Sequence, residues 1–319
     1  MASVLGIIDG GHYVKNPVLV GVTSEALTGN VSFHKVMVEV RAALSTDSEY
    51  TTRVCSAVVP DSSRACPLVV DISSALRAVA DSIEYEPTTL DIPCVQYSLK
   101  AWDEYMKDGE IHDVSEVSGV GGVAYMGGYT DRERILGSYG GFSTKPDTPE
   151  VVGVGESVVV PNGFTTSASY DVTASGANTL GRSVYAVPSD KDRYELRFVN
   201  SRGLIESVSM KCMVQGVQKM EQKENVRAMQ ETMRKFSRMS IRKTSNTPSL
   251  KMNSGPLDKA WLRWFVEEFL VTQDAWIKID GAWLHCNVTS EDSISTVNRM
   301  KREILSLDFE IKLDFNGAF

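Results

Sequence analysis

A strict alternation of apolar and polar residues marks the segment "ILSLDFEIKLDF", residues 304–315. Successive side chains of a β-strand point to opposite faces, so this pattern predicts a strand with one buried face. The apolar face consists of Leu305, Leu307, Phe309, Ile311 and Leu313. A half-buried strand needs neighbouring strands and a covering layer. The chain is therefore expected to contain at least one sheet packed against a second layer.

Similar β-rich runs recur in both halves of the chain. In "VSFHKVMVEVRA", residues 31–42, the more apolar face carries His34, Val36, Val38 and Val40. In "RFVNSRGLIESV", residues 197–208, Asn200 and Gly203 mark the turn of a hairpin. We therefore expect a mainly β (α+β) protein with two β-sandwich-like domains, the second carrying a C-terminal helix packed on a β-hairpin and a final strand.

A change in composition places the domain boundary. Residues 119–141 are rich in glycine and tyrosine, and "STKPDTPEVVGVGE" then adds two prolines. We predict an N-terminal β-rich domain over 1–148, with one helix near 72–84 and a Gly/Tyr-rich loop at 119–141. A C-terminal β domain follows over 149–319.

Period-3.6 patterns predict both helices. Asp71 or Ser73 can cap the first. Its apolar residues are Ala75, Leu76, Val79, Ala80 and Ile83. The second, over 257–271, is the stronger, with Pro256 near its first turn. Its apolar stripe consists of Leu257, Trp261, Trp264, Phe265 and Phe269.

Four of the five tryptophans lie between Trp261 and Cys286. The residues after the helix predict a hairpin turning at Asp280-Gly281. We expect the helix to pack across this hairpin. The expected structural core is Trp261, Trp264, Phe265, Phe269 and Trp276. A ligand cage would need convergent polar groups, and His285 is the one nearby candidate.

A basic arm covers residues 219–243, with eight Lys and Arg against three Glu. One interpretation is a solvated helix or long hairpin arm. Another is a docking arm that binds acidic side chains of a neighbouring subunit. The candidate interaction residues are Arg234, Lys235, Arg238, Arg242 and Lys243.

Composition narrows the function classes. The net charge of -8 argues against broad or sequence-specific binding of nucleic acid, which requires a basic face. The sequence contains no run of about 18 apolar residues, so it predicts no membrane span. The N-terminus lacks the pattern of a secretory signal. The five cysteines are scattered and form no CxxC pair. We expect reduced thiols in a protein made in a bacterial cytoplasm.

The chemical motifs are weak. "GVGGVA", residues 119–124, matches a dinucleotide fingerprint in letters but has no flanking strand–helix pattern. His285 and Cys286 are adjacent and would face opposite sides of a strand. The four histidines share no metal spacing. We therefore expect no enzyme, catalytic residue, metal or cofactor, although the paired acids of a glycosidase can come from distant strands and leave no local motif.

The order of segments resembles a group of virion and prophage tail proteins from phages of Bacteroides-type bacteria. The resemblance is carried by "VVDISSALRAVAD", "STKP", "YELRFVNSRGLIESV", "SGPLDKAWLRWFVEEFLVTQDAWIKIDGAWLHCNVTSED" and "LSLDFEIKLDFNG". The chain also resembles distal tail and baseplate-hub proteins in architecture and size. This resemblance implies a structural subunit of the virion tail that assembles into a ring, with no catalytic residues to transfer. The C-terminal helix and hairpin depart from the sandwich-like second domain of a generic distal tail protein.

Two function classes remain open. The first is a structural subunit of a phage tail that forms a homo-oligomeric ring, with six-fold symmetry as the hypothesis, and docks other tail proteins. The alternative is a carbohydrate-binding or carbohydrate-acting β-sandwich protein. The exposure of Trp261, Trp264, Trp276 and Trp283 discriminates between them, because a sugar platform needs exposed indoles.

Overall fold

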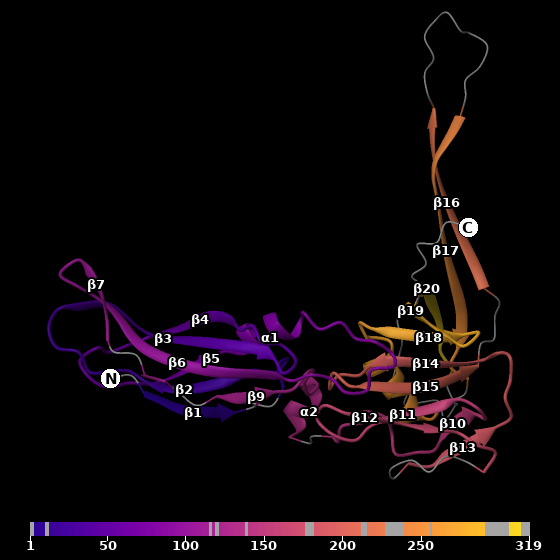
Figure 1. Ribbon diagram of the computed structural model, residues 1–319, viewed down its shortest axis with the longest axis horizontal. Coiled ribbons are helices and arrows are strands. Elements are labelled where there is room, and N and C mark those ends of the chain that lie inside the picture. Colours follow the sequence, from indigo (N-terminus) through magenta and orange to yellow (C-terminus); the bar gives the residue numbers. More distant parts are fainter. Residues whose placement is uncertain are drawn as a thin grey trace, which may run out of the picture. The chain divides into compact units, whose positions relative to one another are not determined.

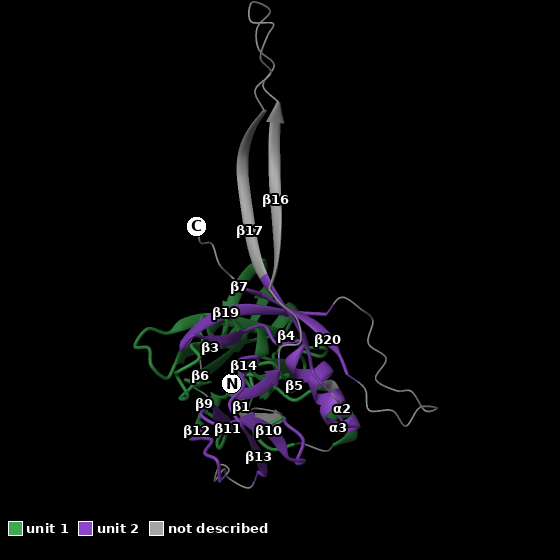
Figure 2. Cartoon of the chain, turned by 90° about the vertical axis from the view of Figure 1, so that its right-hand side faces the viewer, with its two compact units in different colours: residues 1–144, 161–168, 199–205 green, residues 145–160, 169–198, 206–319 purple. Residues whose placement is uncertain are grey.

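The computed structural model describes residues 3–9, 13–114, 117–118, 121–137, 140–175, 182–211, 216–226, 239–255, 257–290 and 306–313. The fold is mainly β, as predicted (Figure 1). The chain forms two compact units (Figure 2). Unit 1 comprises 1–144, 161–168 and 199–205, and unit 2 comprises 145–160, 169–198 and 206–319. The first change of unit, after Thr144, lies close to the expected boundary, but the later changes are marked by no shift in composition.

Unit 1 contains two antiparallel sheets. The smaller has the order β1-β2-β5, formed by Ser3–Asp9, Leu19–Thr23 and Pro67–Asp71. The larger has the order β4-β3-β6-β7, formed by Thr51–Val58, Val31–Leu44, Val95–Lys107 and Glu110–Asp113. The short strands β8 (Val117–Ser118) and β9 (Gly122–Ala124) also pair with β6.

Strand β3 has the predicted two faces. His34, Val36, Val38 and Val40 are buried, and the residues between them are half-buried or exposed. The register against β6 shifts between Ser32 and Lys35, where Phe33 has a φ of 54°. His34 is 3% exposed, and its Nε2 lies 3.0 Å from the buried carboxylate of Asp103.

Helix α1 (Ser73–Ala80) is shorter than the predicted 72–84. The Asp71 carboxylate accepts a hydrogen bond from the Ser73 backbone N–H at 2.9 Å, which supports the start of the helix. The predicted apolar positions from Ala75 to Ala80 are buried. Ile83 follows the helix and is half-buried.

The segment predicted as a loop at 119–141 contains regular structure, which corrects that expectation. It includes β9 and the short helix α2 (Asp131–Leu136). Thr130 and Glu133 form a capping box, in which each side chain accepts a hydrogen bond from the other residue's backbone N–H. The letters "TDRE" at 130–133 carry this signal, but the surrounding glycines mask it.

Unit 2 is built on a seven-stranded sheet of order β15-β14-β18-β19-β20-β17-β16. In that order the strands are Ile205–Lys211, Arg193–Val199, Ala275–Ile279, Ala282–Thr289, Asp308–Leu313, Met239–Asn253 and Gly216–Val226. Two smaller pairs accompany it: β10 (Glu150–Gly153) with β13 (Val184–Val187), and β11 (Ser157–Pro161) with β12 (Ser167–Asp171). The alternation predicted for the final strand is confirmed at Phe309, Ile311 and Leu313, which are buried.

The helix predicted over 257–271 is divided into two forms. Helix α3 (Lys259–Trp264) starts at Asp258, whose carboxylate accepts hydrogen bonds from two backbone N–H groups at 2.8 and 2.9 Å. A π-helical turn, η1 (Phe265–Phe269), follows, closed by the Leu270 N–H donating to the Phe265 carbonyl. The widened turn lets the rings of Trp264 and Phe269 stack at 6.4 Å, although residues five apart diverge on a regular α-helix.

The predicted hairpin after the helix is confirmed. Strands β18 and β19 pair with Ile279 opposite Ala282 and Lys278 opposite Trp283. Asp280 and Gly281 both have positive φ, at 50° and 83°, as a type I′ turn requires.

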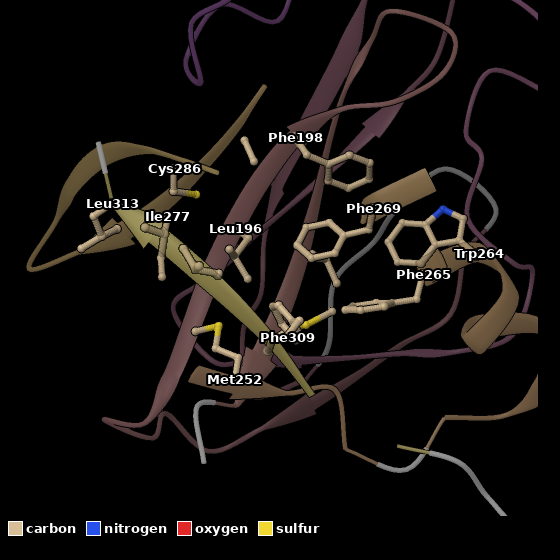
Figure 3. Close-up of a cluster of buried hydrophobic side chains, with 14 residues drawn as sticks. Leu196, Phe198, Met252, Trp264, Phe265, Phe269, Ile277, Cys286, Phe309 and Leu313 are labelled. Atoms are coloured by element: carbon tan, nitrogen blue, oxygen red, sulfur yellow. The ribbon is translucent and has the colours of Figure 1, made fainter. Parts of the chain in front are cut away.

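The main core of unit 2 lies between the seven-stranded sheet and the α3–η1 helix. Figure 3 shows the rings of Phe198, Trp264, Phe265 and Phe269 gathered on one side of the strands. Alternate hairpin residues such as Ala275 and Ile277 join this cluster. Trp276 is buried, at 5% exposure, but it belongs to the opposite face of the sheet, because it alternates with them. Its expected place in the structural core is confirmed by this burial, on the face of the sheet away from the helix.

Candidate functional site

A groove with a volume of about 960 Å³ lies beside helix α3 in unit 2. It lies between the helix and strands β10, β13 and β15. Its apolar lining includes Val151, Tyr185, Met210, Leu257, Trp261 and Phe265.

Trp261 is the indole that this groove presents. It is half-buried, and its ring meets that of buried Trp264 at 5.2 Å in an edge-on arrangement. Tyr185 on the lining is 63% exposed. The polar lining includes Arg193, which donates a hydrogen bond to the Ser209 hydroxyl at 3.0 Å, and the N-cap residue Asp258. The groove thus combines aromatic surface with a few charged groups, which is the composition of a binding site.

A cluster of charges lies on the sheet face opposite the helix. The buried carboxylate of Glu195 accepts hydrogen bonds from Ser157, Arg197 and Lys278 at 2.5, 3.2 and 3.3 Å. The Arg197 guanidinium lies 4.5 Å from the centre of the Trp283 ring, and the Lys278 ammonium lies 5.5 Å from it. Each charge therefore has a partner of opposite sign or an aromatic face, so the cluster serves to fix the sheet to β11.

Strands β16 and β17 form a two-stranded ribbon where they leave the sheet. They pair from Gly216 opposite Leu250 to Val226 opposite Met239. Strand β20 pairs with β17 over Ser249–Asn253. Pro248 comes next and has no N–H to donate to a further neighbour. We define the ribbon as residues 218–226 and 239–248.

The predicted interaction residues fall in and beyond this ribbon. Arg234, Lys235 and Arg238 lie outside the described residues. Lys243 lies in β17 opposite Lys223. Arg242 stands at a register shift between that pair and the pair Glu224–Ile241. The described parts of the basic arm, 219–226 and 239–243, are thus paired antiparallel strands, which agrees with the hairpin form expected for it.

A cluster in unit 1 was not predicted from the sequence. Arg202 is 2% exposed and forms an ion pair with Glu133. Its guanidinium also donates to the Gly128 carbonyl at 2.7 Å and lies 4.4 Å from the centre of the Tyr129 ring. Tyr13 packs edge-on against Tyr129 at 5.0 Å.

The electrostatics of this cluster follow from burial and pairing. Burial, followed by the nearby Tyr129, raises the pKa of Tyr13 to about 12. Burial alone would raise the pKa of Glu133, but hydrogen bonds from Arg202 and the Thr130 backbone outweigh it and lower the pKa. Glycines allow the backbones to approach, since a Cβ on Gly127 would lie 2.1 Å from the Arg202 carbonyl carbon. These contacts hold Arg202 against Gly128, Tyr129 and Glu133, so the cluster serves the structure of unit 1.

Among the described residues, no three His, Cys, Asp or Glu side chains gather as a metal site. The "GVGGVA" segment supplies β9, which pairs with β6. No helix in the described part of the chain is both long and apolar enough to cross a membrane. Comparison with known proteins identified no matching family model, no similar curated protein and no similar solved structure.

Proposed function

We propose that this protein is a structural subunit of a phage tail, acting by self-assembly and by docking neighbouring tail proteins rather than as an enzyme. The observation that carries the proposal is the ribbon, in which β17 continues beyond its last β20 partner and pairs with β16. The resemblance seen in the sequence supports a place in the virion tail, as a distal tail, baseplate-hub or tube-associated protein, within a closed ring that we take as six-fold.

The ribbon is suited to docking because of its shape and its charge. An isolated two-stranded hairpin is at best marginally stable in water, so a long ribbon gains stability when another surface covers it. The segment 219–243 carries eight Lys and Arg against three Glu, within a chain of net charge -8. A basic arm on an acidic protein favours contact with a second copy.

A shortened ribbon tests this proposal. Residues 218–248 are replaced by Asn-Gly, which joins the paired residues Val217 and Ser249 through a two-residue turn. We expect the parent to form a ring in light scattering and negative-stain images, and the variant to lose the ring while keeping its melting temperature. Because the contacts are charged, the parent ring should also weaken as salt rises.

The matched control replaces Arg242 and Lys243 with glutamine and leaves the length of the ribbon unchanged. Weaker assembly of this control would assign the effect to charge. A parent that stays monomeric at all protein and salt concentrations, or a shortened variant that assembles as the parent does, would overturn the proposal.

A carbohydrate-binding protein is the second candidate, favoured by the groove at Trp261. Trp264 and Trp276 are buried and cannot offer a sugar platform, whereas Trp261 and Trp283 are half-buried. Trp261→Ala should abolish binding to a sugar panel while Trp283→Ala retains it. A parent that binds no sugar on the panel would remove this candidate.

A further inference from the structure

One face of the large sheet in unit 1 is open to solvent. Strands β4, β3 and β6 lie side by side (Figure 1), and their inward side chains, such as Val38 and Leu99, are buried. The opposite side chains form what we call the outer face. The central members of this face are Val54, Ser56, Val58, Lys35, Met37, Glu39, Lys100, Trp102 and Glu104. Val54 and Val58 are 50% and 69% exposed, and the β3 and β6 members are half-buried.

The register arranges these nine residues in three rows across the strands. The middle row is Ser56–Met37–Trp102. The row on one side is Val58–Lys35–Glu104, and the row on the other side is Val54–Glu39–Lys100. Along β3 the charge changes sign across Met37, and along β6 it changes sign across Trp102. Along β4 a valine stands on both sides of Ser56.

This pattern is complementary to itself under a two-fold rotation. The two-fold axis lies in the face and runs along the middle row. It places the row Val58–Lys35–Glu104 of one copy over the row Val54–Glu39–Lys100 of its partner. Lys35 then meets Glu39 of the second copy, and Glu104 meets its Lys100. The two valines meet each other. Met37 and Trp102 face their own counterparts at the centre, which gives an apolar middle with charges on either side.

We propose that the outer face of β4–β3–β6 binds a second copy of this chain through a two-fold axis along Ser56–Met37–Trp102. Sheets that pack face to face are rotated by about 30°. Contacts near the axis are least affected by that rotation, and all the charges named lie one row from it. The four charged positions in these three rows all match in sign under the rotation, which favours a second copy over an unrelated partner.

This inference depends on the register of unit 1 and does not depend on the proposed tail function. The ribbon lies in unit 2, so the two contacts can be removed separately. A two-fold contact by itself produces a dimer, and combined with a ring it produces an assembly with an even number of subunits. A chain that dimerises without forming rings would support this inference and count against the proposed function.

Two charge reversals in the full chain test the axis. Alone, Lys35→Glu would place its new carboxylate against Glu39 of the second copy, and Glu39→Lys would place its new ammonium group against Lys35. We expect either variant to self-associate at least about tenfold more weakly than the parent, because opposed like charges are strongly unfavourable. In an equimolar mixture, both carboxylates of the first variant meet both ammonium groups of the second. Association should then return to within about threefold of the parent.

Sedimentation velocity at micromolar concentrations measures each species, and thermal melts verify that each variant is folded. If a charge reversal unfolds the chain, because Lys35 also lies opposite Glu104 of its own sheet, the pair Val58→Glu and Val54→Lys takes its place. These positions are exposed on β4, and their mixture brings the new carboxylate of one variant against the new ammonium group of the other. A parent that does not self-associate, variants that associate as the parent does, or mixtures that fail to recover would each overturn the inference.

Discussion

At the scale of single residues, burial separates the tryptophans of the C-terminal segment into different roles. Trp264 is 4% exposed and contacts Phe198 and Trp261 at ring distances of 5.6 and 5.2 Å. Trp276, on the other side of the sheet, meets His285 edge-on at 5.9 Å. Trp283 is half-buried beneath Arg197. Most of the indole therefore contributes to packing, on both faces of one sheet.

The first prediction compares two of these residues. Trp264→Ala should lower the free energy of unfolding by about 3–5 kcal/mol, because it leaves a cavity among rings that cannot close it. Trp283→Ala should cost less than about 2 kcal/mol, because its ring is half-buried and mainly loses cation–π contacts. Urea unfolding followed by fluorescence measures both. Equal losses in the two variants would contradict the burial pattern.

At the scale of elements, the hairpin between β18 and β19 depends on its turn. Gly281 has a φ of 83°, and a Cβ added there would meet no atom within 4 Å. Any cost of a side chain at this position must therefore come from the backbone conformation, which L-residues with a Cβ adopt reluctantly.

The second prediction follows because backbone strain at Gly281 can be measured without a steric clash. Gly281→Ala should destabilise unit 2 by about 1–2 kcal/mol, the cost of a left-handed conformation for a residue with a Cβ. Gly141→Ala is the matched control, because its added Cβ also meets open space and its φ lies outside the left-handed region. The control should change the melting temperature little. A similar shift in both variants would rule out turn strain as the cause.

Some elements of unit 2 could be predicted from the sequence and others could not. The two-residue alternation of 304–315 and the Asp280-Gly281 turn were predictable, because each depends on neighbours in the chain. The π-helical turn was not, because Trp264 and Phe265 fit the apolar stripe of an ordinary helix equally well. The burial of Trp276 was predictable from its size, and its alternation with Ile277 places it on the face of the sheet opposite the helix. For the candidate site, the basic composition of the arm was visible, whereas the pairing of β17 with β20 and the groove at Trp261 depend on contacts between distant segments.

At the scale of the whole chain, the two units are interleaved in sequence. Unit 1 takes two short segments, 161–168 and 199–205, from beyond the expected boundary. The first brings Phe164, whose ring stacks on Tyr125 at 4.4 Å. The second brings Arg202 to Glu133 and Tyr129, and the Ser201 carbonyl accepts a hydrogen bond from Gly128 at 2.7 Å. Composition cannot reveal this exchange, because neither segment differs from its surroundings.

The third prediction concerns residues 1–148, the N-terminal domain expected from the sequence. Expressed alone, this fragment lacks Phe164 and Arg202, so Tyr125 and Tyr129 lose the groups that cover them and Glu133 loses its ion pair. Loss of Arg202 leaves Glu133 without its ion-pair partner, which lowers the stability of the fragment. The loss of aromatic packing lowers that stability further. We expect the fragment to lack a cooperative thermal transition and to bind a hydrophobic dye, whereas the full chain melts cooperatively. As a control, Arg202→Met in the full chain removes the ion pair and keeps Phe164, and should lie between the two. If the fragment melted cooperatively at the temperature of the full chain, the returning segments would not be required for the stability of unit 1.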